Sequence, residues 1–158
     1  MNDHFCVMLR ITNRCNASCD YCSTDTNNQT VMSNTELGES CDSLKSYMHS
    51  LKIDPKDTAV TVCMLGGELT TLSLNRLREV KEIVESKLSH FRELEIGLQT
   101  NLIMSGNKML DVYDLFDGNV GTSIDNFSSA RKFKGSSTRY RQIFSENYLK
   151  VKNERGVS

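Results

Sequence analysis

Residues 59–68 read Ala-Val-Thr-Val-Cys-Met-Leu-Gly-Gly-Glu. The first seven form an apolar run rich in β-branched residues, without the polar alternation of a half-exposed strand. Runs of this kind are typical of strands that are buried on both faces of a parallel sheet covered by helices. The run therefore predicts a parallel strand that ends in a small, polar loop, Gly66-Gly67-Glu68.

The sequence on either side alternates between strand and helix patterns. A capping box, Ser33 with Glu36, is expected to start the first helix, and Gly156 is expected to end the last. We predict strands at 5–11, 59–65, 94–98 and 120–124, and helices at 37–51, 74–88, 109–116 and 138–155. Four βα units in alternation indicate an α/β fold, either a doubly wound sheet or part of a (β/α) barrel. No repeat or linker marks a second domain, so residues 1–158 are predicted to form one unit.

Composition excludes several classes of protein. The 158 residues contain 19 Lys and Arg against 20 Asp and Glu, a formal net charge of -1, which argues against a nucleic-acid-binding face. No stretch is apolar for long enough to span a membrane, and residues 1–5 lack the pattern of a signal peptide. We therefore expect a soluble, cytoplasmic protein with neither nucleic acid nor a membrane as a partner.

Three of the six cysteines, Cys15, Cys19 and Cys22, lie in one short loop after the first strand. Since nothing in the sequence signals an oxidising compartment, metal binding is favoured over a disulfide framework. Structural zinc usually takes four protein ligands, whereas three thiolates on a [4Fe–4S] cluster leave one iron open to a small molecule. Iron–sulfur binding is favoured and zinc stays the alternative. The other cysteines, Cys6 and Cys63 on strands and Cys41 on a helix, are interpreted as small buried hydrophobic residues.

Polar or small residues also follow the later strands. They are Gly66-Gly67-Glu68, then Thr100-Asn101, then Ser123 and Asp125, which alternate on the predicted fourth strand and would point the same way. Ligands of parallel α/β proteins bind at the carboxyl ends of the strands. The sequence therefore predicts one site at this edge of the sheet.

The cysteine loop resembles the signature of the radical S-adenosylmethionine (radical SAM) superfamily. Its spacing is Cys-x3-Cys-x2-Cys, with the aromatic Tyr21 just before the third cysteine. The resemblance implies that Cys15, Cys19 and Cys22 hold a [4Fe–4S] cluster whose fourth iron binds SAM, and that Tyr21 borders the adenine. It also implies reductive cleavage of SAM to a 5′-deoxyadenosyl radical that abstracts hydrogen from a substrate.

The later motifs are similar to those of the same family and occur in the same order. The resemblance implies that Gly66 and Gly67 let backbone approach SAM, and that Glu68 meets its ammonium group. It also implies ribose contacts from Ser123 and Asp125, while Thr100-Asn101 resembles the Thr-Asn-Gly that often ends the third strand. Here Leu102 follows where other members often have glycine.

The chain most resembles the peptide- and protein-modifying branch, which includes sulfatase-maturing enzymes and maturases of ribosomal peptides. The resemblance implies a radical SAM enzyme of oxidoreductase type, with a peptide or protein substrate and an electron donor such as a flavodoxin or ferredoxin. Because a full barrel takes about 250 residues, we expect the N-terminal part of a core domain, a partial TIM-type barrel. Two copies pairing through the exposed sheet edge would complete such a sheet. The alternative is a non-catalytic iron–sulfur or zinc-binding scaffold, or a fragment that needs a partner.

Overall fold

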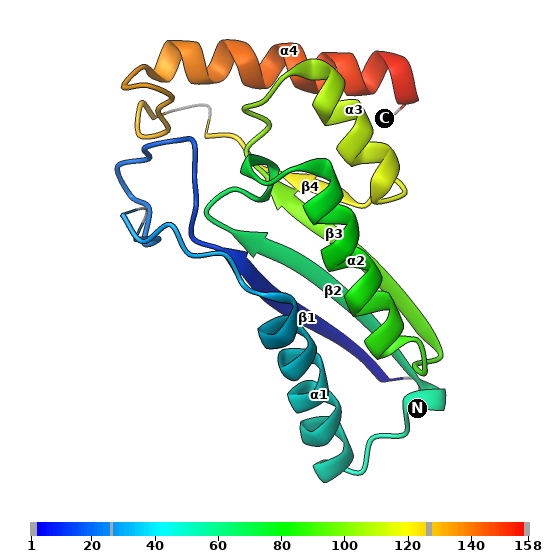
Figure 1. Cartoon of the computed structure of the whole chain (residues 1–158). Helices are drawn as coiled ribbons and strands as arrows, with labels where there is room; N and C mark the ends of the chain where they lie inside the picture. The colour runs from blue at the N-terminus through cyan, green and yellow to red at the C-terminus, as the bar shows by residue number, and fades with distance from the viewer. Residues whose placement is uncertain (1–2, 26, 126–127, 157–158) are drawn as a thin grey trace.

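The computed structural model describes residues 3–25, 27–125 and 128–156 (Figure 1). Over these residues strands and helices alternate, as the sequence predicts. In chain order the elements are β1 (Asp3–Thr12), α1 (Asn34–Ser50), η1 (Pro55–Asp57), β2 (Thr58–Gly66), η2 (Leu69–Thr71), α2 (Leu74–Leu88), β3 (Glu93–Thr100), α3 (Gly106–Leu115), β4 (Val120–Thr122) and α4 (Ser137–Arg155).

The strands form one parallel sheet in the order β1-β2-β3-β4. Val62 is the register partner of Val7 on one side and of Ile96 on the other, and β3 also pairs with β4, so β2 and β3 are the central strands. The sheet is open, and α1 and α2 lie side by side on one of its faces (Figure 1). The predicted fold class is confirmed: this is an α/β arrangement of the kind found in part of a (β/α) barrel.

The helix boundaries follow from local hydrogen bonds. The capping box is formed, because the Glu36 N–H donates to Ser33 Oγ (3.3 Å) and the Ser33 N–H donates to Glu36 Oε2 (2.7 Å). Gly156 ends α4 in the left-handed conformation, with φ of 68°. The fourth strand is shorter than predicted, since β4 ends at Thr122 rather than at Ile124.

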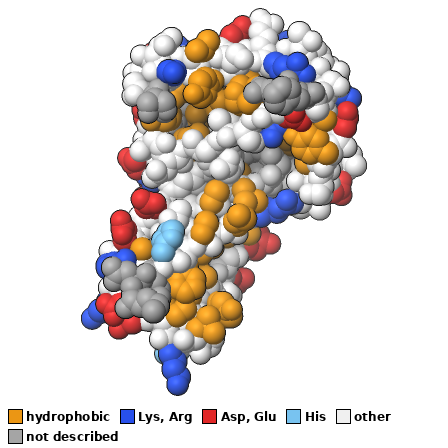
Figure 2. Space-filling model, turned by 180° about the vertical axis from the view of Figure 1, so that it is seen from behind, with side chains coloured by type: hydrophobic (Ala, Val, Ile, Leu, Met, Phe, Trp, Pro, Cys, Tyr) orange, Lys and Arg blue, Asp and Glu red, His pale blue; other side chains and the backbone are white. Residues whose placement is uncertain are grey.

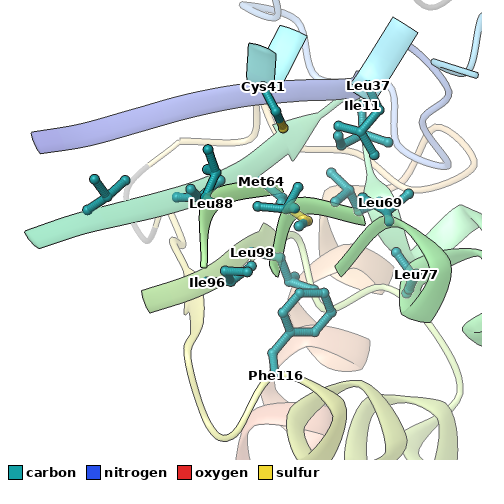
Figure 3. Close-up of a cluster of buried hydrophobic side chains, with 14 of the residues drawn as sticks. Ile11, Leu37, Cys41, Met64, Leu69, Leu77, Leu88, Ile96, Leu98 and Phe116 are labelled. Atoms are coloured by element: carbon teal, nitrogen blue, oxygen red, sulfur yellow. The ribbon is translucent and has the colours of Figure 1, made fainter. Parts of the chain in front are cut away.

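The main core lies between the sheet and helices α1 and α2. Figure 3 shows Met64 of β2 among side chains contributed by the neighbouring elements, including Leu37, Leu98 and Phe116, all of which are almost fully buried. A second cluster joins α3 to α4 around Tyr140 and the turn after β3. The second cluster therefore supports the edge at which β3 ends, through Leu102 and Ile103.

Over the described residues, no helix packs on β1 at the opposite face of the sheet (Figure 1). On this strand the side chain of Met8 is 74% exposed and that of Cys6 is also exposed. Figure 2, seen from behind, shows hydrophobic side chains gathered along this face. The prediction that Cys6 is a buried residue is therefore wrong, because the strand alternates and only its other face meets α1. Cys41 is buried as predicted, and Cys63 is half-buried.

Candidate functional site at the carboxyl edge of the sheet

The ends of β1 and β2 are joined by the glycine pair. Thr12 and Gly66 are register partners, and beyond them the Gly67 N–H donates to the Thr12 carbonyl (2.9 Å) and the Glu68 N–H to the Arg14 carbonyl (2.6 Å). A Cβ on Gly66 would lie 2.2 Å from the Thr12 carbonyl oxygen, and one on Gly67 would lie 2.4 Å from that of Arg14. The glycines therefore let the start of the cysteine loop pack directly on the end of β2.

Glu68 is buried, with 1% of its surface exposed, and its carboxylate is surrounded by donors. Oε1 accepts hydrogen bonds from the Thr70 N–H (3.0 Å), the Thr70 hydroxyl (2.6 Å) and the Thr100 hydroxyl (2.8 Å). Oε2 accepts one from the Asn101 N–H (2.6 Å). Each carboxylate oxygen has two lone pairs, and Oε2 accepts one bond, so Oε2 retains capacity for one more donor. Glu68 thus ties the end of β2 to the end of β3.

The turn after β3 has leucine where the Thr-Asn-Gly motif that it resembles has glycine. Leu102 adopts φ of 58°, in the left-handed region, although its side chain is only 3% exposed. The Leu102 N–H donates to Thr100 Oγ1 (3.1 Å) and the Ile103 N–H to Asn101 Oδ1 (2.8 Å). Burial of the leucine side chain and these two bonds offset the strain of the left-handed conformation.

Asn101 also reaches the cysteine loop. Its Nδ2 donates to Asn16 Oδ1 (2.8 Å), and Asn16 Nδ2 in turn donates to the Ile103 carbonyl (2.5 Å). Behind it, the Tyr140 hydroxyl donates to the Asn101 carbonyl (3.4 Å). Burial raises the pKa of Tyr140, while the hydrogen bond from Arg131 lowers it, with burial the larger effect. Tyr140 therefore keeps its proton at neutral pH and remains a donor.

Among the three loop cysteines, Cys15 is close enough to the other two to be affected by charge on them. Burial is the main cause that raises the pKa of the Cys15 thiol. The hydrogen bond from the Ala17 N–H (3.4 Å) lowers it, and negative charge at Glu68, Cys19 and Cys22 raises it. Cys15 and Cys19 are half-buried and Cys22 is exposed. Among the described residues, no three His, Cys, Asp or Glu side chains are arranged as a ready set of metal ligands.

A hollow of about 160 Å³ opens at the carboxyl edge, between the ends of β2, β3 and β4. Most of the residues expected to bind a cofactor line it, namely Gly66, Gly67, Glu68, Thr100, Asn101 and Ser123. The rest of the lining is formed by Leu65, Gln99 and Arg131. Tyr21, Asp125 and the loop cysteines do not line it. The sequence motifs after three separate strands therefore meet in one place, as the topology of a parallel sheet requires.

The expectation that Ser123 and Asp125 alternate on a strand is wrong. Both follow β4, where the chain has left the ladder. The Ser123 hydroxyl accepts a hydrogen bond from Arg131 Nη2 (2.8 Å), and the Asp125 carboxylate accepts one from the Ser128 N–H (3.1 Å). Only Ser123 reaches the hollow.

Arg131 is the site residue that the sequence analysis missed. It lines the hollow and donates hydrogen bonds to Tyr21, Ser123 and Tyr140. It lies in an irregular segment, outside every strand end and every motif, so no spacing or periodicity could have marked it.

Comparisons with known proteins agree with this architecture. No family model matches the sequence. An uncharacterized protein of Methanocaldococcus jannaschii, MJ0907, is 26% identical over 119 residues, which cover 75% of this chain and 38% of that protein. The solved structures of anSMEcpe with bound AdoMet, and with AdoMet and the peptide Kp18Cys, have TM-scores of 0.58 and 0.60 at 16% identity.

These structures share the fold of this chain. The match covers 92% of this chain but 41% of the anSMEcpe chain, so the protein spans less than half the length of its structural neighbour. At this identity the likeness concerns the arrangement of strands and helices. Their ordered alternation over nearly the whole chain places the hollow at the edge where parallel α/β proteins bind ligands. In the described residues, no helix is both long and apolar enough to cross a bilayer.

Proposed function

We propose that this chain is the N-terminal part of a radical SAM core and acts in the reductive cleavage of S-adenosylmethionine. The observation that carries the proposal is the meeting, at one sheet edge, of a three-cysteine loop and a polar hollow lined from three strand ends. The shared fold with an enzyme solved with AdoMet bound supports it. The bound cluster and SAM would supply a 5′-deoxyadenosyl radical for hydrogen abstraction.

The metal ligands that we propose are Cys15, Cys19 and Cys22. Three thiols of one loop suit an iron–sulfur cluster better than a hard cation, and they leave a fourth iron for a small molecule. The loop that carries them is held to β2 through Gly67 and Glu68, which would keep the thiols at the rim of the hollow.

For SAM, we propose contacts from the lining of the hollow and from its rim. Gly66 and Gly67 would offer backbone at close range, and Glu68 would face the ammonium group with the lone pair that its four donors leave free. Hydroxyl and amide groups of the lining would meet the polar parts of the ligand. Their proposed members are Thr100, Asn101 and Ser123, with Tyr21 and Asp125 at the rim.

We propose a peptide or protein as the substrate. The support is that anSMEcpe, an anaerobic sulfatase-maturating enzyme, was solved with the peptides Cp18Cys and Kp18Cys bound. An electron donor such as a flavodoxin or ferredoxin would deliver the reducing electron. Pairing of two copies along an open edge of the sheet would extend the partial barrel; over the described residues, β1 and β4 each have one strand neighbour.

The test is reconstitution without oxygen, followed by assay of iron, sulfide and SAM turnover. We expect about four iron and four sulfide per chain, and release of 5′-deoxyadenosine when dithionite is added. Cys19→Ala should lose both. Cys6→Ala is the matched control, because Cys6 is exposed but lies on β1 outside the loop. A Cys19→Ala protein that still holds the full cluster and cleaves SAM would overturn the proposal.

The rival function is a non-catalytic metal-binding scaffold, or a fragment that needs a partner. It is favoured by the lack of a ready ligand set among the described side chains and by the short span relative to anSMEcpe. Iron-free protein with stoichiometric zinc, or SAM binding without cleavage, would select this rival.

A further inference from the structure

The cysteine loop is hydrogen-bonded to a segment that lies more than 100 residues later in the sequence. The Ser18 N–H donates to the Lys132 carbonyl and the Asp20 N–H donates to the Ala130 carbonyl, both at 2.9 Å. Donors two residues apart thus meet acceptors two residues apart, as in a short β-ladder. Lys132 Nζ also forms an ion pair with Asp20 (2.7 Å). We name residues 130–132 the brace.

Arg131 occupies the middle of the brace and joins three parts of the molecule. Its Nε donates to the Tyr21 hydroxyl (2.6 Å), between the second and third loop cysteines. Its Nη1 donates to the Ser123 carbonyl (2.7 Å) and to the Tyr140 hydroxyl (3.2 Å), and its Nη2 to Ser123 Oγ (2.8 Å). The guanidinium carbon also lies 6.0 Å from the centre of the Tyr21 ring.

The geometry of the guanidinium group explains why an arginine is suited to position 131. A guanidinium has five N–H donors in one rigid plane, so it can hold a hydroxyl on one side while it binds a backbone carbonyl and a second hydroxyl on the other. Lysine has a single mobile ammonium group and cannot fix these partners at once. The guanidinium group of Arg131 therefore sets the distance between Tyr21 of the cysteine loop and Ser123, which follows β4.

We propose that Arg131 is a positioning residue, which fixes the cysteine loop against the rim of the hollow through the Tyr21 hydroxyl. The proposal rests on the proposed function in one respect, that the positioned loop carries the metal ligands. Arg131 need not touch the metal or the reacting atoms. It acts by limiting the opening of the segment that contains Cys19 and Cys22.

Amide hydrogen exchange measures this positioning without metal or SAM. The readout is exchange at the Ser18 and Asp20 amides, because they donate to the brace. In Arg131→Lys we expect these two amides to exchange about tenfold faster, since the charge-assisted bond to Tyr21 is lost. Core amides of β2 should be unchanged. Arg139→Lys is the control: its guanidinium packs on Phe133, and the variant keeps a cation there.

A second variant tests whether Arg131 acts through Tyr21. Tyr21→Phe removes only the hydroxyl, so it should reproduce the faster exchange, and adding it to Arg131→Lys should produce little further change. Unchanged exchange at both amides in either single variant, with exchange in β2 preserved, would overturn the proposal.

Iron retention after reconstitution gives a separate readout, in which Arg131→Lys should lose iron faster than the control variant. If the wild-type protein takes up no iron, the proposed function fails while the exchange result still decides the role of Arg131. If iron binds normally and exchange is unaffected, only the inference about Arg131 fails.

Discussion

Replacement of Glu68 by glutamine probes the hydrogen-bonded centre of the site. The side chain keeps its shape, but one carboxylate oxygen becomes an amide group that donates rather than accepts. With the amide oxygen in the place of Oε1, the bonds from Thr70 and Thr100 remain and the Asn101 N–H loses its acceptor. The change therefore tests a charge and one acceptor while it leaves the packing unaltered.

The size of the effect follows from the count of donors. Each of the three retained bonds weakens by about 1 kcal/mol when the acceptor loses its charge, and an unsatisfied buried N–H costs about 1–3 kcal/mol. The sum is about 4–6 kcal/mol. Because contributions within one network are not additive, we expect the free energy of unfolding to fall by about 3–5 kcal/mol.

Urea denaturation followed by circular dichroism, on protein without metal, measures this loss. Glu36→Gln is the matched control, since the Glu36 carboxylate also accepts bonds from a backbone N–H and a hydroxyl but lies at the surface. We expect a much smaller shift for the control. If Glu68→Gln unfolds at the same urea concentration as the wild type, Glu68 does not hold the ends of β2 and β3 together.

Two further changes test the backbone of the site. Gly66→Ala should destabilise the protein by more than about 3 kcal/mol, because the new Cβ would lie 2.2 Å from a carbonyl oxygen of β1. Gly38→Ala is the control: it lies within α1, its new Cβ would be 3.5 Å from Lys87, and it should be neutral or stabilise by up to about 1 kcal/mol. Equal melting temperatures for Gly66→Ala and Gly38→Ala would contradict the packing argument. Leu102→Gly should lower stability by up to about 4 kcal/mol, since losing a buried leucine costs about 2–5 kcal/mol and relief of the left-handed conformation returns about 1–2 kcal/mol. A variant with a higher melting temperature would mean that strain outweighs burial at this turn.

Periodicity was sufficient to predict the sheet and its helices. The run 59–65 and the capping box at Ser33 each depend on residues close in sequence, and both correspond to the observed β2 and α1. The end of β4 was misjudged because Ser123 and Ile124 are compatible with a strand, yet the ladder to β3 ends at Thr122. A strand end depends on its neighbour in the sheet, which local pattern does not report.

The site was predictable as a location and less so as a set of contacts. Parallel topology alone brings Gly66 and Thr100 to one edge. The hydrogen bond from Thr100 to the Glu68 carboxylate joins residues 32 positions apart, and the one from Arg131 to Tyr21 joins residues 110 positions apart. Local sequence patterns do not report such contacts, because they form only when the fold brings distant parts of the chain together.

The brace also bears on the order in which the protein folds. The pair Lys132 and Asp20 is separated by 112 residues, whereas α1, α2 and their neighbouring strands meet through much shorter intervals of chain. Contacts that close long loops carry the larger entropic cost and tend to form late. We therefore expect the cysteine loop to be completed late in folding, after the sheet that supports it. Until the brace closes, the segment that carries Cys19 and Cys22 would move freely beside a core that is already formed.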